Sequence, residues 1–186
     1  ALIIADVSGK GTTAAFHMSQ MKGIFHSLAQ QELDPKEFME RANRALVFCL
    51  GRGSFISASF FVINSKLKRI RYSRAGHCPV LYHRAATLTT EYLKDKGAAL
   101  GMVRSNDYCR LVETREINYE QGDIMLLYTD GITEAKNQRG DEFGYDRLAE
   151  ALREVTSKNA AEIERYIIQK LYEFSGSNEI DDDYTS

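Results

Sequence analysis

The hydrophobic pattern changes its period along the chain, and this change limits the possible fold more than any other feature. Apolar residues recur at three- and four-residue spacing through residues 14–29 and again through 38–49, which predicts two successive amphipathic helices. From residue 55 to about residue 93 the chain is instead rich in β-branched and aromatic residues separated by turn-like segments, which predicts strands. Helical spacing returns in residues 145–155 and 160–174.

The order of these segments predicts the fold class. A strand, two helices, several strands and two helices do not follow the strand–helix alternation of a parallel sheet, so we expect an α+β fold with antiparallel sheets. The segments from 55 to 93 are expected to form an antiparallel meander, and Asp34-Pro35 is expected to begin the second helix. The expected strands are Leu2–Ala5, Phe55–Ile63, Arg69–Arg74, Val80–His83, Thr87–Leu93, Cys109–Ile117 and Ile124–Thr129.

Composition excludes several classes of partner. The 186 residues suggest one domain, and the net charge of −2 gives no case for nucleic acid or an anionic membrane as the main partner. No apolar run approaches the ~18 residues of a membrane span, and we expect neither a signal peptide nor insertion of this segment into a membrane. Cys49, Cys78 and Cys109 are expected to be buried, reduced thiols of a cytoplasmic protein.

Two short apolar runs each end in an aspartate that is followed by a glycine-containing turn. Leu2–Ala5 leads to Asp6, and Ile124–Thr129 leads to Asp130. If the two strands lay side by side, the two carboxylates would meet, and ionised carboxylates repel each other unless a proton or a cation intervenes. Clusters that contain only oxygen ligands suit Mg²⁺ or Mn²⁺. The acidic run at residues 181–183 could complete such a cluster.

Each of these features also has an ordinary structural explanation. An aspartate before glycine is commonly a turn residue, and a terminal acidic run is commonly a solvated tail. The segment Ser8–Thr12 looks like part of a phosphate-binding P-loop, but Ile4 stands where its first glycine is required and Gly11 stands where Ser or Thr must follow the lysine. The spacing alone therefore excludes a P-loop and leaves the metal site open.

A series of short motifs follows in order along nearly the whole chain. They are Asp6–Gly11 (DVSGKG), Ala75–Pro79 (AGHCP), Leu100-Gly101, Gly122-Asp123, Tyr128–Ala135 (YTDGITEA), Phe143-Gly144 and Asp182–Thr185 (DDYT). Together they resemble the motifs of the PPM (protein phosphatase 2C-like) superfamily. Within it, they are similar to those of bacterial serine/threonine phosphatases of the sporulation stage II protein E and RsbU type.

The resemblance implies a β-sandwich of two antiparallel sheets flanked by pairs of antiparallel helices, with two Mn²⁺ or Mg²⁺ ions at one edge. It implies that Asp6 bridges the two metals and that the backbone carbonyl of Val7 binds one of them. Asp130 and Asp182 would bind the other, with Asp183 as the alternative if the register is shifted by one. Asp6 and Asp130 are thus the candidate catalytic residues.

The resemblance also implies an activity. A hydroxide that bridges the metals would hydrolyse phosphoserine or phosphothreonine on a protein, without a covalent intermediate. The implied substrate is an anti-anti-sigma-factor-like regulator in bacterial signalling, and a sensor or receiver domain would lie upstream in the parent chain. His77 is expected to be a packed or hydrogen-bonded turn residue rather than a catalytic acid.

The sequence departs from the family pattern at both ends. An upstream GGDxxD-like motif and the strand after DDxT are not found in residues 1–186. We therefore expect a single phosphatase domain that lacks its N-terminal strand or strands and its C-terminal strand, and a fragment of this kind could be inactive by itself. The alternative is a phosphatase-fold binding module that regulates a partner without turnover, which the loss of metal-binding carboxylates would favour.

Overall fold

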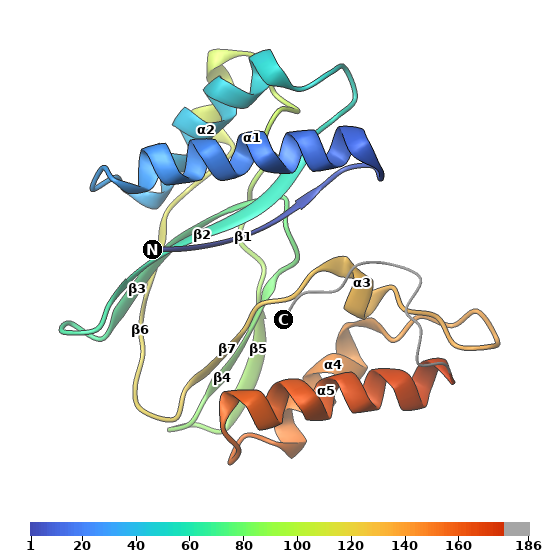
Figure 1. Cartoon of the computed structure of the whole chain (residues 1–186). Coiled ribbons are helices and arrows are strands. Elements are labelled where there is room, and N and C mark those ends of the chain that lie inside the picture. Colours follow the sequence, from blue (N-terminus) through green and yellow to red (C-terminus); the bar gives the residue numbers. More distant parts are fainter. Residues whose placement is uncertain (177–186) are drawn as a thin grey trace. The chain divides into compact units, whose positions relative to one another are not determined.

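The computed structural model describes residues 1–176, and the chain divides into two compact units. The first unit comprises Ala1–His77 and Asp95–Tyr119, and the second comprises Cys78–Lys94 and the chain from Glu120 onward. Each unit contains an antiparallel sheet and a pair of longer helices (Figure 1). The predicted α+β fold with two antiparallel sheets is confirmed.

The first unit has a four-stranded sheet covered by two helices. The strand order is β1 (Leu2–Val7), β2 (Ile56–Asn64), β3 (Arg69–Ala75) and β6 (Arg115–Asn118). Helices α1 (Thr12–Ala29) and α2 (Pro35–Cys49) run in opposite directions beside this sheet (Figure 1). Helix α2 begins as predicted, because the Asp34 side chain accepts a hydrogen bond from the Lys36 backbone N–H at 3.0 Å and Pro35 is its first residue.

The register of β1 against β2 decides which side chains face the helices. Val7 pairs with Ile56, and Asp6 pairs with Ser57. Because successive side chains of a strand point to opposite faces, Val7 and Ile56 enter the core on the helix side, whereas Asp6 and Ser57 stand on the other face. The buried residues of this core are Val7, Met21, Phe38, Met39, Ala42, Leu46, Leu50, Ile56, Ala58, Phe60, Ala75, Leu100, Tyr108 and Val112.

The second unit has a three-stranded sheet in the order β5 (Thr89–Leu93), β4 (Val80–Arg84) and β7 (Ile124–Leu126). Its helices are α3 (Asp130–Thr133), α4 (Gly144–Glu154) and α5 (Ala160–Ser175), and the last two agree closely with the predicted ranges. The buried residues of its core are Leu81, Leu126, Tyr128, Ile132, Phe143, Leu148, Ala149, Ala151, Leu152, Val155, Ile163, Ile167 and Leu171.

Three predicted strand features were wrong. The meander is broken between β3 and β4, which belong to different sheets. The segment Cys109–Ile117 is not one strand, because a 3₁₀ helix, η1 (Asn106–Arg110), precedes the short β6 and is capped by the Ser105 hydroxyl at the Asp107 N–H. The run Ile124–Thr129 is a paired strand only as far as Leu126, and α3 begins at Asp130.

The cysteines are free thiols, as predicted, but Cys49 at the end of α2 is exposed rather than buried, and the other two are half-buried. Cys49 is exposed because α2 turns only one stripe of side chains toward the sheet, and the last buried residue of that stripe is Leu46. None of the helices within residues 1–176 is long and apolar enough to cross a membrane.

Candidate functional site

Asp6 lies near the end of β1, where pairing with β2 and the burial of the next side chain anchor the backbone. Its Cα is the register partner of Ser57, and the neighbouring Val7 side chain is buried in the first core. The chain then passes through Gly9 and Gly11, whose φ angles are +91° and +79°, before α1 begins. Side chains other than glycine rarely adopt such φ values, so this sharp turn after the half-buried Asp6 carboxylate requires glycine.

The backbone carbonyl of Val7 points away from β2. The Ser8 N–H donates to the Phe55 carbonyl at 3.0 Å, and hydrogen-bonded pairs alternate with non-bonded pairs in an antiparallel ladder. The Val7–Ile56 pair is therefore a non-bonded pair, and Ile56 instead exchanges backbone hydrogen bonds of 2.9 and 2.8 Å with Leu100. Since β1 is an edge strand of the sheet within residues 1–176, this carbonyl is turned outward, as a metal-binding carbonyl must be.

Asp130 is the first residue of α3 and the half-buried member of an otherwise buried segment. Tyr128, Thr129 and Ile132 are buried on either side of it. Its backbone carbonyl accepts hydrogen bonds from the Glu134 N–H at 2.8 Å and from the Thr133 hydroxyl at 3.2 Å. The backbone is thus anchored at this point, and the carboxylate stands in the first turn of a helix rather than in a loop after a strand.

The predicted ligands are divided between the two units. Asp6 and Val7 belong to the first unit and Asp130 to the second, and β1 and β7 lie in different sheets rather than side by side in one sheet. Asp182 and its alternative Asp183 lie outside the described residues. Within residues 1–176, no three His, Cys, Asp or Glu side chains form a group that could hold a metal ion. Of the predicted carboxylate ligands, only Asp6 and Asp130 lie in this part of the chain.

The donor set fits the implied metals. Two carboxylates and one backbone carbonyl are oxygen ligands of the kind that Mg²⁺ and Mn²⁺ prefer, and both carboxylates are half-buried on anchored backbone. Ligands of this chemistry hold such ions together with water and substrate phosphate, so a site of this kind does not need a closed protein cage.

The AGHCP motif forms a contact that the sequence did not reveal. His77 is 3% exposed, and its Nδ1 atom lies 2.9 Å from the Ser57 hydroxyl oxygen. This confirms the prediction that His77 is a packed, hydrogen-bonded turn residue. Ser57 was missed, although two serines at alternate positions of an apolar strand, Ser57 and Ser59, were a visible sign of a polar row on one face of β2.

The GD motif has a structural explanation within the second unit. The Asp123 carboxylate accepts hydrogen bonds from the Tyr82 hydroxyl at 2.6 Å and from the backbone N–H groups of Ala85 and Glu120 at 2.8 and 3.1 Å. Burial by itself raises the pKa of Asp123, but these hydrogen bonds outweigh it and lower the pKa below its ordinary value of 3.8. Asp123 therefore ties the turn before β7 to β4 as an ionised group.

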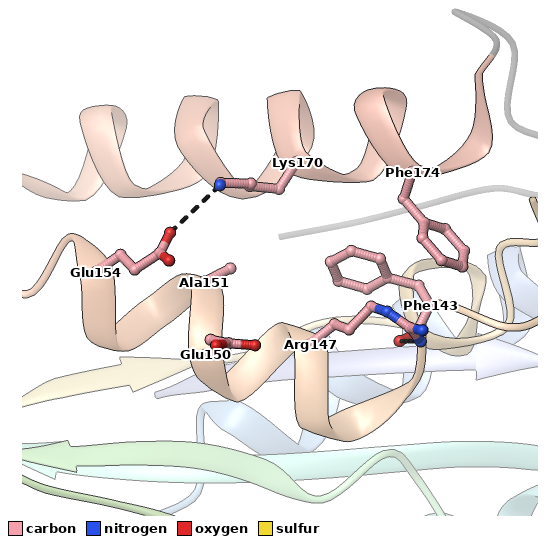
Figure 2. A pocket seen from close by; sticks show the side chains of 7 residues that line it. All are labelled: Phe143, Arg147, Glu150, Ala151, Glu154, Lys170 and Phe174. Atoms are coloured by element: carbon pink, nitrogen blue, oxygen red, sulfur yellow. Dashed lines mark hydrogen bonds and ion pairs between the residues drawn. The ribbon is translucent and has the colours of Figure 1, made fainter.

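A groove of about 220 Å³ lies between α4 and α5 of the second unit (Figure 2). The Arg147 guanidinium lies 4.7 Å from the centre of the Phe174 ring, and Lys170 forms an ion pair with Glu154 at 3.4 Å. The lining residues are Phe143, Arg147, Glu150, Ala151, Glu154, Lys170 and Phe174, and none of them is a predicted metal ligand. Two cationic and two anionic side chains line this groove, so their charges balance and favour neither an anionic nor a cationic ligand.

Comparison with proteins of known sequence gives a relative among phosphatases. The chain is 31% identical over 139 residues to the phosphoserine phosphatase RsbU of Bacillus subtilis. The match covers 75% of this chain and 40% of RsbU, so the chain spans less than half of the length of that relative.

Solved structures share the fold at low sequence identity. The SiaA-PP2C domain of Pseudomonas aeruginosa has a TM-score of 0.81 at 19% identity, with 98% of this chain and 72% of that domain covered. The catalytic domain of the phosphatase PstP in complex with two manganese ions has a TM-score of 0.66 at 14% identity, with coverages of 94% and 81%. RsbX in complex with magnesium also has a TM-score of 0.66, at 20% identity, with coverages of 98% and 76%.

The motifs and the fold agree with the result of a family comparison. The profile that describes stage II sporulation protein E (SpoIIE) matches residues 1–186, which is the whole chain. The chain belongs to the SpoIIE family.

Proposed function

We propose that this chain is the metal-binding part of a phosphatase that hydrolyses phosphoserine or phosphothreonine on a protein. The observation that carries the proposal is the pair of family-motif aspartates, Asp6 and Asp130, each half-buried on anchored backbone, with the Val7 carbonyl turned outward beside Asp6. The relative RsbU is a phosphoserine phosphatase, and two solved structures of the same fold contain manganese or magnesium.

The residues have separate roles in this proposal. Asp6 and the Val7 carbonyl would supply oxygen ligands to metal. Asp130 would supply another carboxylate, and Asp182 a further one. Mn²⁺ or Mg²⁺ held by these residues would supply hydroxide at neutral pH and neutralise charge on the phosphoryl oxygens. Because phosphoryl transfer depends mainly on positioning and charge neutralisation, the chain needs no nucleophilic side chain of its own.

The proposed substrate is a phosphorylated protein rather than a small metabolite. Its class would be a regulator similar to anti-anti-sigma factors, dephosphorylated in a bacterial signalling pathway and controlled by a sensor or receiver domain of the full-length protein. Membership of the SpoIIE family and the similarity to RsbU support this assignment.

The test is metal-dependent hydrolysis by the full-length protein. Mn²⁺ should support release of phosphate from a phosphoserine protein and from p-nitrophenyl phosphate. Asp6→Asn and Asp130→Asn should each lower the rate by about 100-fold or more, the scale of losing one preorganised charge-stabilising group. Asp141→Asn is the matched control, because Asp141 is an exposed carboxylate that accepts a hydrogen bond from Asn137 of the same loop before α4.

Two results would contradict the proposal. One is hydrolysis that proceeds equally well when Mn²⁺ and Mg²⁺ are removed by a chelator. The other is full metal-dependent activity in Asp130→Asn. Mn²⁺ binding without turnover of either substrate would instead favour the regulatory binding module.

A further inference from the structure

We infer that His77 is a positioning residue for Asp6 and acts through Ser57. In this arrangement the His77 ring orients the Ser57 hydroxyl, and that hydroxyl is presented to the Asp6 carboxylate across the β1–β2 pair. The inference rests on the proposed function, because it concerns the surroundings of a proposed metal ligand. It adds two residues, one of which lies outside every family motif.

The register of the first sheet brings the three residues into a row. Asp6 and Ser57 are direct partners in the antiparallel pair of β1 and β2, so their side chains stand on the same face of the sheet. Side chains in such pairs have Cβ atoms about 4.5–5.5 Å apart, which one hydrogen bond or one bridging water can span. On the far side of Ser57, the His77 Nδ1 atom lies 2.9 Å from its hydroxyl oxygen.

The turn after β3 holds the His77 ring at this place. Gly76 has a φ of +71°, and a Cβ at this position would lie 3.0 Å from both the backbone nitrogen and the Cβ of Ala99. Only glycine fits both restrictions. The Arg74 guanidinium then donates to the His77 carbonyl and, at 2.6 Å, to the Asp95 carbonyl. The backbone of His77 is thus clamped, and its ring is buried.

The hydrogen-bonding capacity of a serine explains how His77 acts at a distance. A hydroxyl has one proton to donate and two lone pairs to accept. When the His77 Nδ1–H group donates to Ser57, it fills one lone pair and leaves the hydroxyl proton for an acceptor on the same face, where Asp6 is the register partner of Ser57. A hydroxyl aimed in this way fixes the orientation of a carboxylate that must hold metal, as the outer partners of metal ligands do.

The second unit contains a matched control. His83 on β4 is 4% exposed, and its Nδ1 atom also lies 2.9 Å from a hydroxyl, that of Thr90 on β5. His77→Leu and His83→Leu each remove one buried ring and one hydrogen bond of the same length. Loss of stability in general should therefore appear in both variants, whereas loss of metal positioning should appear only in the first.

The experiment is a calorimetric titration of the full-length protein with Mn²⁺, with thermal unfolding measured in parallel. Ser57→Ala and His77→Leu should each raise the Mn²⁺ dissociation constant by about 10-fold or more, the lower end of the range for outer partners of metal ligands. His77→Asn, which keeps an N–H donor near the position of Nδ1, should recover most of the affinity. His83→Leu should lower the melting temperature and leave the dissociation constant unchanged.

The outcomes separate this inference from the proposed function. Wild-type protein that binds no Mn²⁺, or binding that Asp6→Asn does not weaken, would overturn both. Binding that Asp6→Asn weakens but Ser57→Ala leaves unchanged would overturn the positioning role alone. Equal effects of His77→Leu and His83→Leu, or failure of His77→Asn to recover affinity, would do the same, because the role of His77 would then be structural.

Discussion

Gly97 should be one of the least replaceable positions in the first unit, and Gly97→Ala tests the packing that supports the AGHCP turn. A Cβ at Gly97 would lie 1.6 Å from the Arg74 carbonyl oxygen and 2.6 Å from the Arg74 carbonyl carbon. Both are backbone atoms, so no side-chain rotation relieves the overlap. The backbone of Gly97 also pairs with Val112, which limits how far Gly97 can move.

The size of the effect follows from these distances. Ordinary carbon–oxygen contacts begin at about 3.3 Å, so the two segments must separate by about 1.7 Å. Overpacking that side chains can absorb costs about 1–3 kcal/mol. Movement of two backbone segments should therefore cost about 3 kcal/mol or more of the free energy of unfolding. For a chain of this length that corresponds to a fall of about 6–12 °C in the melting temperature.

The assay compares thermal and urea unfolding of the wild type, Gly97→Ala and Gly23→Ala. Gly23 lies within α1, is exposed, and has no atom within 4 Å of an added Cβ. Its replacement should stabilise the helix by about 0.5–1 kcal/mol. The reasoning would be refuted if Gly97→Ala unfolded within about 0.5 kcal/mol of the wild type, the usual range for surface substitutions.

Three further predictions concern polar side chains. The buried Asn43 side chain bonds the Gly101 N–H and the Val103 carbonyl at 2.8 and 3.0 Å, so urea unfolding of Asn43→Leu should show a loss of about 1–3 kcal/mol for each buried group left unsatisfied. Partial burial raises the pKa of Asp123, but its hydrogen bonds lower the pKa by more. The stability that Asp123 contributes is therefore fully present above pH 3.8, and it is lost as the pH falls through the lowered pKa. The difference in free energy of unfolding between wild type and Asp123→Asn should be constant from about pH 7 to pH 5 and shrink below about pH 4. The capping box at the start of α5 predicts that Asn159→Ala lowers the melting temperature, through a loss of about 1 kcal/mol.

Much of the fold could be predicted from local sequence pattern. The helices were found because their apolar residues repeat at helical spacing and because Asp34-Pro35 is a strong start signal that the structure confirms. What failed was long-range pairing. The turn at Gly76 looked like a hairpin connection, but whether the next strand pairs with β3 depends on β6, which is more than 30 residues away and takes that position.

The candidate site also has a part that local sequence predicts and a part that depends on strand pairing. Asp6, Val7 and Asp130 could be named from motifs, whereas the outward direction of the Val7 carbonyl depends on which β1–β2 pairs are hydrogen-bonded. Local pattern gives the face of a strand to which a side chain points, but the pairing register is a property of two strands. No motif therefore marked Ser57, although the register makes it the partner of Asp6.

The two motifs of the first unit depend on each other through this register. DVSGKG supplies Asp6 from β1, and AGHCP supplies His77 after β3; the two strands do not pair, because β2 lies between them. A slip of one residue in the β1–β2 pairing would turn Asp6 to the helix side, away from the face on which Ser57 contacts His77. The apolar residue Val7 holds this register, since the same slip would take it out of the core while its partner Ile56 stayed there. The hydrophobic core on one face of the sheet thus sets the position of the proposed metal ligand on the other.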